Sequence, residues 1–378
     1  MKKYKVLFVV SEFFKGGAER FTYEIDRVLD KSKFEVTILC LNGKNAKNST
    51  WHRHYHKLHL ALGTKILYND EFLNPQNAII NKLRKKLRIK SKEIINYKLL
   101  VNYLSKFDLI HWMGEYTFYK KLPNFLIKKS LINIMSAKFQ NQNLYKNFDK
   151  KKKYNFISGF TEKEAIYELN EFPQKKHWHF PLIFKIEENK IWNFKNTVIK
   201  KIGIFTRLDK YKPLDPFFYA FQLLLTENKN IELHIFGSGD PEEQGLNLKL
   251  KNLDILDKVF FRGHQENITK TAIIEDLNLS WFQGYNNNRP AGYAGFDICS
   301  VGIPLICWDF YYKKIEKINE VYPHFKNLRY FVDYTIKILT IKEEAIKLSN
   351  NQIKDVMCNR DSSTKIKQLE AIYHEIIN

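Results

Sequence analysis

Cysteine is rare in this chain of 378 residues, which contains only 4. Cys40, Cys299, Cys307 and Cys358 form no Cys-x-x-Cys pair and no zinc-binding spacing. Cys40 and Cys307 lie in apolar runs, so we expect them to be buried free thiols. This expectation favours a reducing compartment.

Long hydrophobic runs are also missing. No window approaches the ~20 apolar residues of a membrane-spanning helix. The basic N-terminus leads into an apolar run at 4–10, which is too short for the core of a signal peptide. We therefore expect a cytoplasmic protein that is either free in solution or attached to the inner face of a membrane.

Acidic residues are too few to balance the basic ones. The chain has 41 Asp and Glu against 62 Lys and Arg, which gives a formal net charge of +21. Such an excess indicates an anionic partner, either phosphates, nucleic acid or an anionic membrane surface. The alternative is a Lys-, Asn- and Ile-rich composition imposed by an AT-rich genome. We find no recognisable nucleic-acid-binding motif.

The first half of the chain alternates strands and helices. Residues 4–10 predict a buried strand, 11–17 a turn, and 34–41 a second strand after a helix that starts at Ala18. This βαβ opening predicts a parallel sheet with a right-handed crossover. Further strands are expected at 107–112, 131–135 and 154–158.

Two stretches of the first half allow more than one interpretation. The histidines at 51–59 could hold a metal, but we favour a strand with one solvated face, because no carboxylate or cysteine clusters beside them. Residues 81–92 form a basic amphipathic pattern that fits either a helix on an anionic bilayer or a plain solvated helix. A second basic region includes Lys150 to Lys153.

The second half restarts the alternation after a polar stretch that follows Pro181. Strands are expected at 199–205, 231–236, 258–262, 277–282 and 303–308, with a helix at 213–226 that Pro213 opens. We therefore predict an α/β protein of two Rossmann-like domains, 1–186 and 187–360, facing across a ligand-binding cleft. The apolar stripe of a last helix at 361–378 predicts a buried face.

Candidate binding residues follow the strands at the carboxyl edges of the two sheets. Gly16 and Gly17 would let a phosphate approach the amides of the first helix. Arg207 and Lys212, after the first strand of the second half, suit a diphosphate. The alternative for each is an ordinary solvated turn. In 281–309, a loop of small residues leads into a short helix that carries Asp297.

These pieces together resemble the GT-B glycosyltransferases of family 4, which are retaining enzymes common in bacterial surface-polysaccharide pathways. The resemblance spans nearly the whole chain and depends on the order and spacing of its motifs. The matching segments are Gly-Gly-Ala-Glu-Arg at 16–20, Asp-Leu-Ile-His at 108–111, Arg-Leu with the lysine at 207–212, Phe-Gly-Ser-Gly at 236–239, Phe-Arg-Gly-His at 261–264, and Asp297 with Gly-Ile-Pro at 302–304.

The resemblance implies roles for the residues that match. Arg207 and Lys212 would hold the donor diphosphate and stabilise the leaving group, which replaces a metal. His111 would contact the transferred sugar, with Glu115 nearby, and Asp297 would hold the ribose. The residues expected at the donor are Gly16, Gly17, Gly237, His264, Arg289, Gly292, Tyr293 and Asp297.

The chain departs from the family pattern at three positions. The first glutamate of the paired-glutamate motif is replaced by Arg289, the second is shortened to Asp297, and a usual second histidine is Met113. Arg289 would bind an acidic sugar or add to the phosphate clamp, with Asn286 to Asn288 supplying polar contacts.

The expected function is metal-free, cofactor-free transfer of a sugar from a UDP- or GDP-sugar to a glycan or lipid-linked acceptor. We expect residues 1–186 to bind the acceptor and residues 187–360 to bind the donor. The helix at 361–378 is expected to pack against the first domain. Peripheral contact with an anionic membrane is expected, and specific nucleic-acid binding is not. The alternatives are a degenerate GT-B or polyanion-binding protein and a nucleotide-sugar epimerase.

Overall fold

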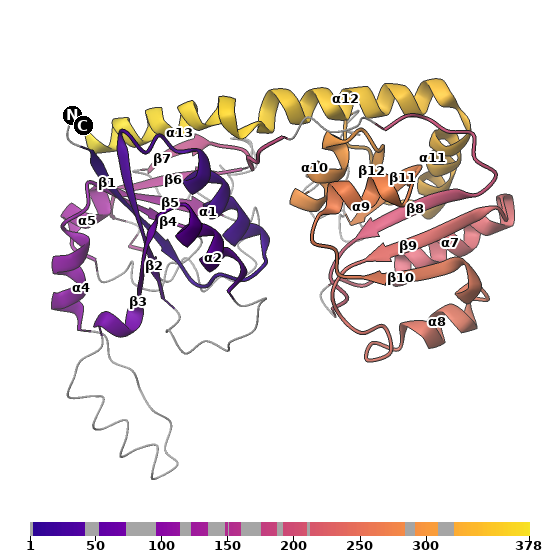
Figure 1. Ribbon diagram of the computed structural model, residues 1–378, viewed down its shortest axis with the longest axis horizontal. Helices are drawn as coiled ribbons and strands as arrows, with labels where there is room; N and C mark the ends of the chain where they lie inside the picture. The colour runs from indigo at the N-terminus through magenta and orange to yellow at the C-terminus, as the bar shows by residue number, and fades with distance from the viewer. Residues whose placement is uncertain are drawn as a thin grey trace, which may run out of the picture. The chain divides into compact units, whose positions relative to one another are not determined.

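The computed structural model describes residues 3–41, 53–72, 96–113, 122–134, 148–149, 151–159, 175–186, 192–209, 212–283, 292–308 and 321–378. These residues form two compact units (Figure 1). The first consists of Met1–Lys185 with Asp361–Asn378, and the second of Ile186–Arg360. Among the described helices, none has the length and apolar composition that crossing a bilayer requires.

The first unit is built on a parallel sheet whose described strands have the order β3-β2-β1-β4-β5-β6-β7. The strands are β1 (Tyr4–Val10), β2 (Phe34–Cys40), β3 (Lys65–Tyr68), β4 (Leu109–Trp112), β5 (Ser130–Ile134), β6 (Tyr154–Ser158) and β7 (Lys175–His179). The helices are α1 (Gly17–Val28), α2 (His54–Ala61), η1 (Asn69–Phe72), α4 (Tyr97–Leu104), α5 (Asn124–Lys128) and α13 (Ser362–Ile377).

Both faces of this sheet are covered, which explains the continuous apolar strands. Leu7 and Val9 of β1 pack in one cluster with residues of α4 and α5. Phe8 points to the opposite face, where it meets His111, and His111 contacts Tyr373 of α13. A strand between two helical layers has no solvated side, so its polar–apolar alternation disappears.

The histidine-rich stretch forms a helix and not the expected strand. Residues His54–Ala61 are α2, and the buried His59 bonds to Asp26 of α1, with 2.7 Å between Nδ1 and Oδ2. Thr64 donates to the same carboxylate oxygen at 2.6 Å. Among the described residues, no three His, Cys, Asp or Glu side chains come close enough together to hold a metal ion. The basic stretch at 81–92 lies outside the described residues.

The second unit repeats the α/β plan with the strand order β10-β9-β8-β11-β12-β13. Its strands are β8 (Lys200–Phe205), β9 (Ile231–Phe236), β10 (Val259–Gly263), β11 (Leu279–Gln283), β12 (Leu305–Trp308) and β13 (His324–Phe325). Its helices are α7 (Asp215–Glu227), α8 (Leu246–Asn252), η4 (Leu256–Lys258), α9 (Ile268–Ile274), α10 (Tyr293–Ser300), α11 (Leu328–Thr340) and α12 (Lys342–Arg360).

The core of the second unit joins α7 and α11 to the sheet. Phe217 of α7 stacks on Trp281 of β11 with ring centroids 6.0 Å apart, and Phe331 of α11 contacts the same indole at 5.0 Å. These large rings hold the carboxyl ends of β8 and β11 against the start of α7. A rigid wall therefore surrounds the place where the two strands end.

Candidate functional site

The strand order of the second sheet reverses between β8 and β11. From β8 the chain runs to β9 and β10 on one side, and it then crosses to β11 and β12 on the other. Open α/β sheets bind ligands in the crevice at the carboxyl ends of such neighbouring strands. This topology marks the end of β8 and the end of β11 as the first place to look for a ligand.

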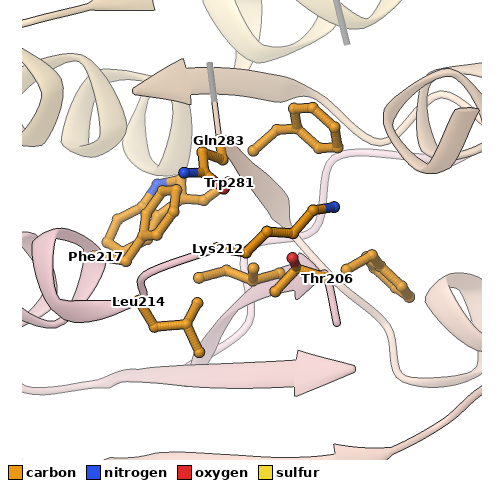
Figure 2. Close-up of a pocket in the computed structure, with 9 residues that line it drawn as sticks. Thr206, Lys212, Leu214, Phe217, Trp281 and Gln283 are labelled. Atoms are coloured by element: carbon orange, nitrogen blue, oxygen red, sulfur yellow. The ribbon is translucent and has the colours of Figure 1, made fainter. Parts of the chain in front are cut away.

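A pocket lies at that position (Figure 2). The space between its lining residues, counted together with the open solvent at its mouth, is about 310 Å³. The lining residues come from the end of β8, the end of β11 and the start of α7. They are Ile204, Phe205, Thr206, Lys212, Leu214, Phe217, Trp281, Phe282 and Gln283.

Lys212 gives this largely apolar pocket a positive charge. Its side chain lines the pocket together with the polar groups of Thr206 and Gln283 (Figure 2), and Gln283 is only 9% exposed. The backbone N–H of Lys212 donates to the Asp209 carbonyl at 3.0 Å, which closes the loop before α7. An ammonium beside aromatic walls and polar side chains is suited to bind an anionic ligand.

Arg207 does not line the pocket. Its guanidinium is half exposed, and its Nη2 lies 3.5 Å from Asp209 Oδ2. An ion pair at such an exposed position contributes little to stability, so a stronger anion can displace the carboxylate. The two cations that the sequence paired therefore occupy different positions, with Lys212 in the pocket and Arg207 on the loop surface.

The Gly-Ser-Gly turn after β9 holds the loop that carries Arg207. The Leu208 N–H donates to the Ser238 carbonyl at 2.8 Å, and the Thr206 N–H donates to Phe236 at 2.9 Å. A Cβ on Gly237 would lie 2.6 Å from the Thr206 carbonyl carbon and closer still to its oxygen. Gly239 has a φ of +121°, which L side chains rarely adopt. Gly237 thus fixes the loop by close packing, a role that the sequence analysis did not anticipate.

The N-terminus of α10 adjoins the pocket wall. Gly292 is the N-cap residue, and a Cβ built on it would lie 3.8 Å from the Phe282 ring. Tyr293 begins the helix, and Asp297, one turn further on, is 6% exposed. The amides of this first turn are oriented to receive an anion.

The other predicted donor residues are more scattered. His264 is exposed directly after β10, while Arg289 and Glu115 lie outside the described residues. In the first unit, Gly16 caps α1 and Gly17 is its first residue. A Cβ on Gly16 would meet the Glu19 carboxylate, which folds back over this end of the helix.

The structure places His111, the residue predicted to contact the transferred sugar, in the core of the first unit. The imidazole is 0% exposed, its Nδ1 lies 2.8 Å from the Tyr373 hydroxyl, and the Phe8 ring packs against it. Burial lowers the pKa of His111 to about 3, so the ring is neutral at physiological pH. It is a core residue of β4 that packs against α13, and the strand motif alone does not indicate on which face its side chain lies.

Sequence reasoning also missed several residues that build the pocket, namely Thr206, Phe282 and Gln283. Each stands at or directly after the carboxyl end of β8 or β11. The signal that could have found them is the strand order, since only the neighbouring positions of β8 and β11 bring these ends together.

No family model and no curated protein matches the sequence. Solved structures match nearly its full length. A mutant of TarM from S. aureus, in complex with fondaparinux, α-GlcNAc-glycerol and UDP, aligns with a TM-score of 0.68 and 13% identity over 98% of this chain and 99% of that chain. HepE of Anabaena in complex with UDP-glucose aligns with a TM-score of 0.65 and 12% identity over 98% and 99%.

A third match is the lipopolysaccharide outer core galactosyltransferase WaaB in its apo form, with a TM-score of 0.63 and 13% identity over 98% of this chain and 99% of that chain. At these identities the likeness concerns the fold. It confirms the predicted class, an α/β protein of two Rossmann-like domains with the GT-B fold.

Proposed function

We propose that this protein is a glycosyltransferase that moves a sugar from a nucleotide-sugar donor to a hydroxyl of a glycan or lipid-linked acceptor. The observation that carries the proposal is the pocket at the carboxyl ends of β8 and β11, with Lys212 in its wall. The nearby N-terminus of α10 and the loop of Arg207 add further donors for a diphosphate. The fold shared with TarM, HepE and WaaB supports the same assignment.

The proposed reaction is a single transfer with retention at the anomeric carbon. The bond from the anomeric carbon to the donor phosphate oxygen breaks, and a bond to the acceptor oxygen forms. The acceptor proton moves to the departing phosphate oxygen, so no protein nucleophile is needed. Lys212 and Arg207 would stabilise the negative charge that grows on that phosphate, which is the work a metal does in other transferases.

UDP or GDP is the proposed donor nucleotide, and surface-polysaccharide or glycoconjugate synthesis is the proposed pathway class. UDP is present in the TarM complex, and WaaB is described as a galactosyltransferase of the lipopolysaccharide outer core. The +21 net charge fits anionic substrates. We assign donor binding to the second unit and acceptor binding to the first.

The test is a thermal-shift screen of UDP, GDP, CMP and their sugars in EDTA. We expect one nucleotide class to raise Tm, because a ligand that binds only the folded state stabilises it by mass action. NMR of the product formed from the selected donor then reports the anomeric configuration. Binding of DNA with no response to any nucleotide would favour the polyanion-binding alternative, and a strict requirement for Mg²⁺ would contradict metal independence.

A surface of the first unit supports peripheral contact with an anionic membrane at the cytoplasmic face. Leu99 of α4 is 45% exposed and Phe125 of α5 is 53% exposed. Exposed lysines of the same unit are Lys98 on α4, Lys106 after it, Lys128 on α5, and Lys151 and Lys153 before β6. The two helices are tied together because Lys129 Nζ donates to the Ser105 carbonyl at 2.9 Å. Apolar tips among lysines are typical of proteins that lie on anionic bilayers.

Cosedimentation with vesicles checks this proposal. We expect binding to phosphatidylglycerol vesicles but not to phosphatidylcholine, and a Phe125→Ser/Lys128→Ser variant should bind about tenfold more weakly. Ile274→Ser/Lys270→Ser on α9 is the matched control, since it removes an exposed isoleucine and a lysine from the other unit. Equal weakening by the two double variants would refute a specific membrane face.

A further inference from the structure

The last residue of α12 packs directly on the helix that carries Asp297. The guanidinium carbon of Arg360 lies 3.6 Å from the centroid of the Phe296 ring, and Arg360 is only 9% exposed. Phe296 is the residue before Asp297 on α10. Figure 1 shows α10 next to α12 in the second unit. Any shift of α10 on binding a ligand therefore acts on Arg360.

A second contact fixes the same ring from another side. Tyr322 meets Phe296 edge-on with centroids 5.7 Å apart, and its hydroxyl donates to Asp355 Oδ2 at 2.7 Å. Arg360 Nε lies 3.8 Å from that carboxylate oxygen. Phe296 is thus held by two groups that share Asp355, so the position of Arg360 follows the position of the ring.

The residues directly after Arg360 pair with another segment of the chain. Asp361 forms a parallel bridge with Phe184, and the Ser362 N–H donates to the Phe184 carbonyl at 3.0 Å. Phe184 is 2% exposed and stands at the end of the first unit's N-terminal part. This junction lies one peptide bond from the Arg360 stack.

Arg20 packs on Phe184 of this junction. Its guanidinium carbon lies 5.5 Å from the centroid of the Phe184 ring. The Glu24 carboxylate accepts hydrogen bonds from Arg20 Nε at 3.5 Å and from the Lys185 N–H at 3.3 Å. Arg20 is the fourth residue of α1, three positions after Gly17. The contacts therefore run from α10 to α1 through one residue pair, Phe184 and Asp361.

We propose that Arg360 and Arg20 are positioning residues that couple donor binding at α10 to the N-terminus of α1 through the junction of Phe184 with Asp361 and Ser362. The inference rests on the proposed function, because it takes the ligand at α10 to be the nucleotide donor. Neither arginine needs to touch substrate. Each holds a ring whose position sets a helix end, and a small displacement of such an element is enough to lower the rate of transfer.

Hydrogen exchange of the full chain, followed by mass spectrometry with and without saturating UDP, tests the coupling. In the wild type, UDP should slow exchange about fivefold or more at Ser362 and in the first turn of α1. Arg360→Met keeps the length of the side chain but removes the planar cation, and it should abolish both effects at saturation. Arg20→Met should abolish only the effect in α1.

Arg329→Met is the matched control for these variants. Arg329 lies in the second unit, is half exposed, and pairs with Glu227 and Asp333 at 2.9 and 2.8 Å. Its replacement should leave the slowing of exchange by UDP unchanged. Arg360→Lys should keep part of the slowing that Arg360→Met loses. The proposal is overturned if Arg360→Met responds to UDP as the wild type does.

Kinetics give a second readout when each rate is divided by the folded fraction of the variant, because partial unfolding alone would also lower the apparent kcat at an unchanged KM. Arg360→Met should lower kcat about tenfold while the donor KM changes less than about threefold. The kcat of the Arg20→Met/Arg360→Met double variant should be no lower than that of the less active single variant, because both arginines act through one junction. Multiplied losses would mean independent effects and would refute the coupling.

The failure of the donor assignment gives a different pattern. If the wild type binds neither UDP nor GDP, the proposed function is overturned. Hydrogen exchange without nucleotide then tests whether Arg360 positions the junction. Arg360→Met should then still speed exchange at Ser362 relative to Arg329→Met. Unchanged exchange would show that the Arg360 stack does not position the junction either.

Discussion

Lys212→Ala is expected to lower kcat for sugar transfer by about 100- to 1,000-fold. Lys212 contributes the positive charge of the pocket at the ends of β8 and β11. A group that stabilises charge on a departing phosphate acts most strongly in the transition state, so its loss affects kcat more than KM. Initial rates with the donor found in the nucleotide screen measure the effect.

Lys251→Ala is the control for this variant. It removes one lysine from the same unit, from an exposed position on α8 away from the pocket lining. We expect it to retain wild-type kcat and nucleotide binding. If Lys212→Ala stays within about threefold of Lys251→Ala, less than the effect of a single lost charge contact, Lys212 is not the phosphate-stabilising group.

Arg207→Ala provides a useful comparison. The guanidinium is half exposed and paired with Asp209. To act on the donor it must exchange this partner for the diphosphate, whereas Lys212 already lines the pocket. The different starting positions give Lys212 the larger expected effect.

The sheet of each unit could be predicted from sequence because its central strands are buried on both faces. Runs such as 4–10 and 231–236 are mainly apolar, with Lys5 as the one charged residue of the first, and their ends agree with β1 and β9. β7 was missed because its sequence, Lys-Lys-His-Trp-His, resembles a solvated segment. It pairs with β6 at the end of the strand order, where one edge has no described neighbour and polar residues are tolerated.

The helix α2 was missed for a different reason. Histidines at alternate positions suggested a strand, but His59 is fixed by Asp26 of α1 and by the fold around it. Such a buried hydrogen bond depends on residues 33 positions apart, which local periodicity cannot indicate. The same limit explains His111, whose partner Tyr373 lies 262 positions away.

The candidate site was predictable at the level of loops and not of side chains. The sequence placed Lys212 and Arg207 after the first strand of the second half, and it placed Asp297 on a short helix. It could not show that Lys212 lines a pocket while Arg207 pairs with Asp209, because this depends on the crossing from β10 to β11 that brings β11 beside β8.

Gly237→Ala is expected to have the largest effect on the fold around the site. The new Cβ would lie 2.6 Å from the Thr206 carbonyl carbon and 3.3 Å from the Arg207 nitrogen. Both neighbours are backbone atoms at the end of β8, so no side chain can rotate away. The strand end must shift, and with it the loop from Thr206 to Lys212.

We expect Gly237→Ala to lower the free energy of unfolding by about 3 kcal/mol, which urea titration measures. Gly245→Ala is the control, since its φ is +62° but no atom lies within 4 Å of the added Cβ. That variant should lose about 1 kcal/mol from the left-handed backbone alone and keep its nucleotide affinity. Gly237→Ala should lose nucleotide binding even at temperatures where it is folded, because the displaced loop carries Arg207 and leads to Lys212. Normal binding in folded Gly237→Ala would show that the packing of the turn after β9 does not position the donor site.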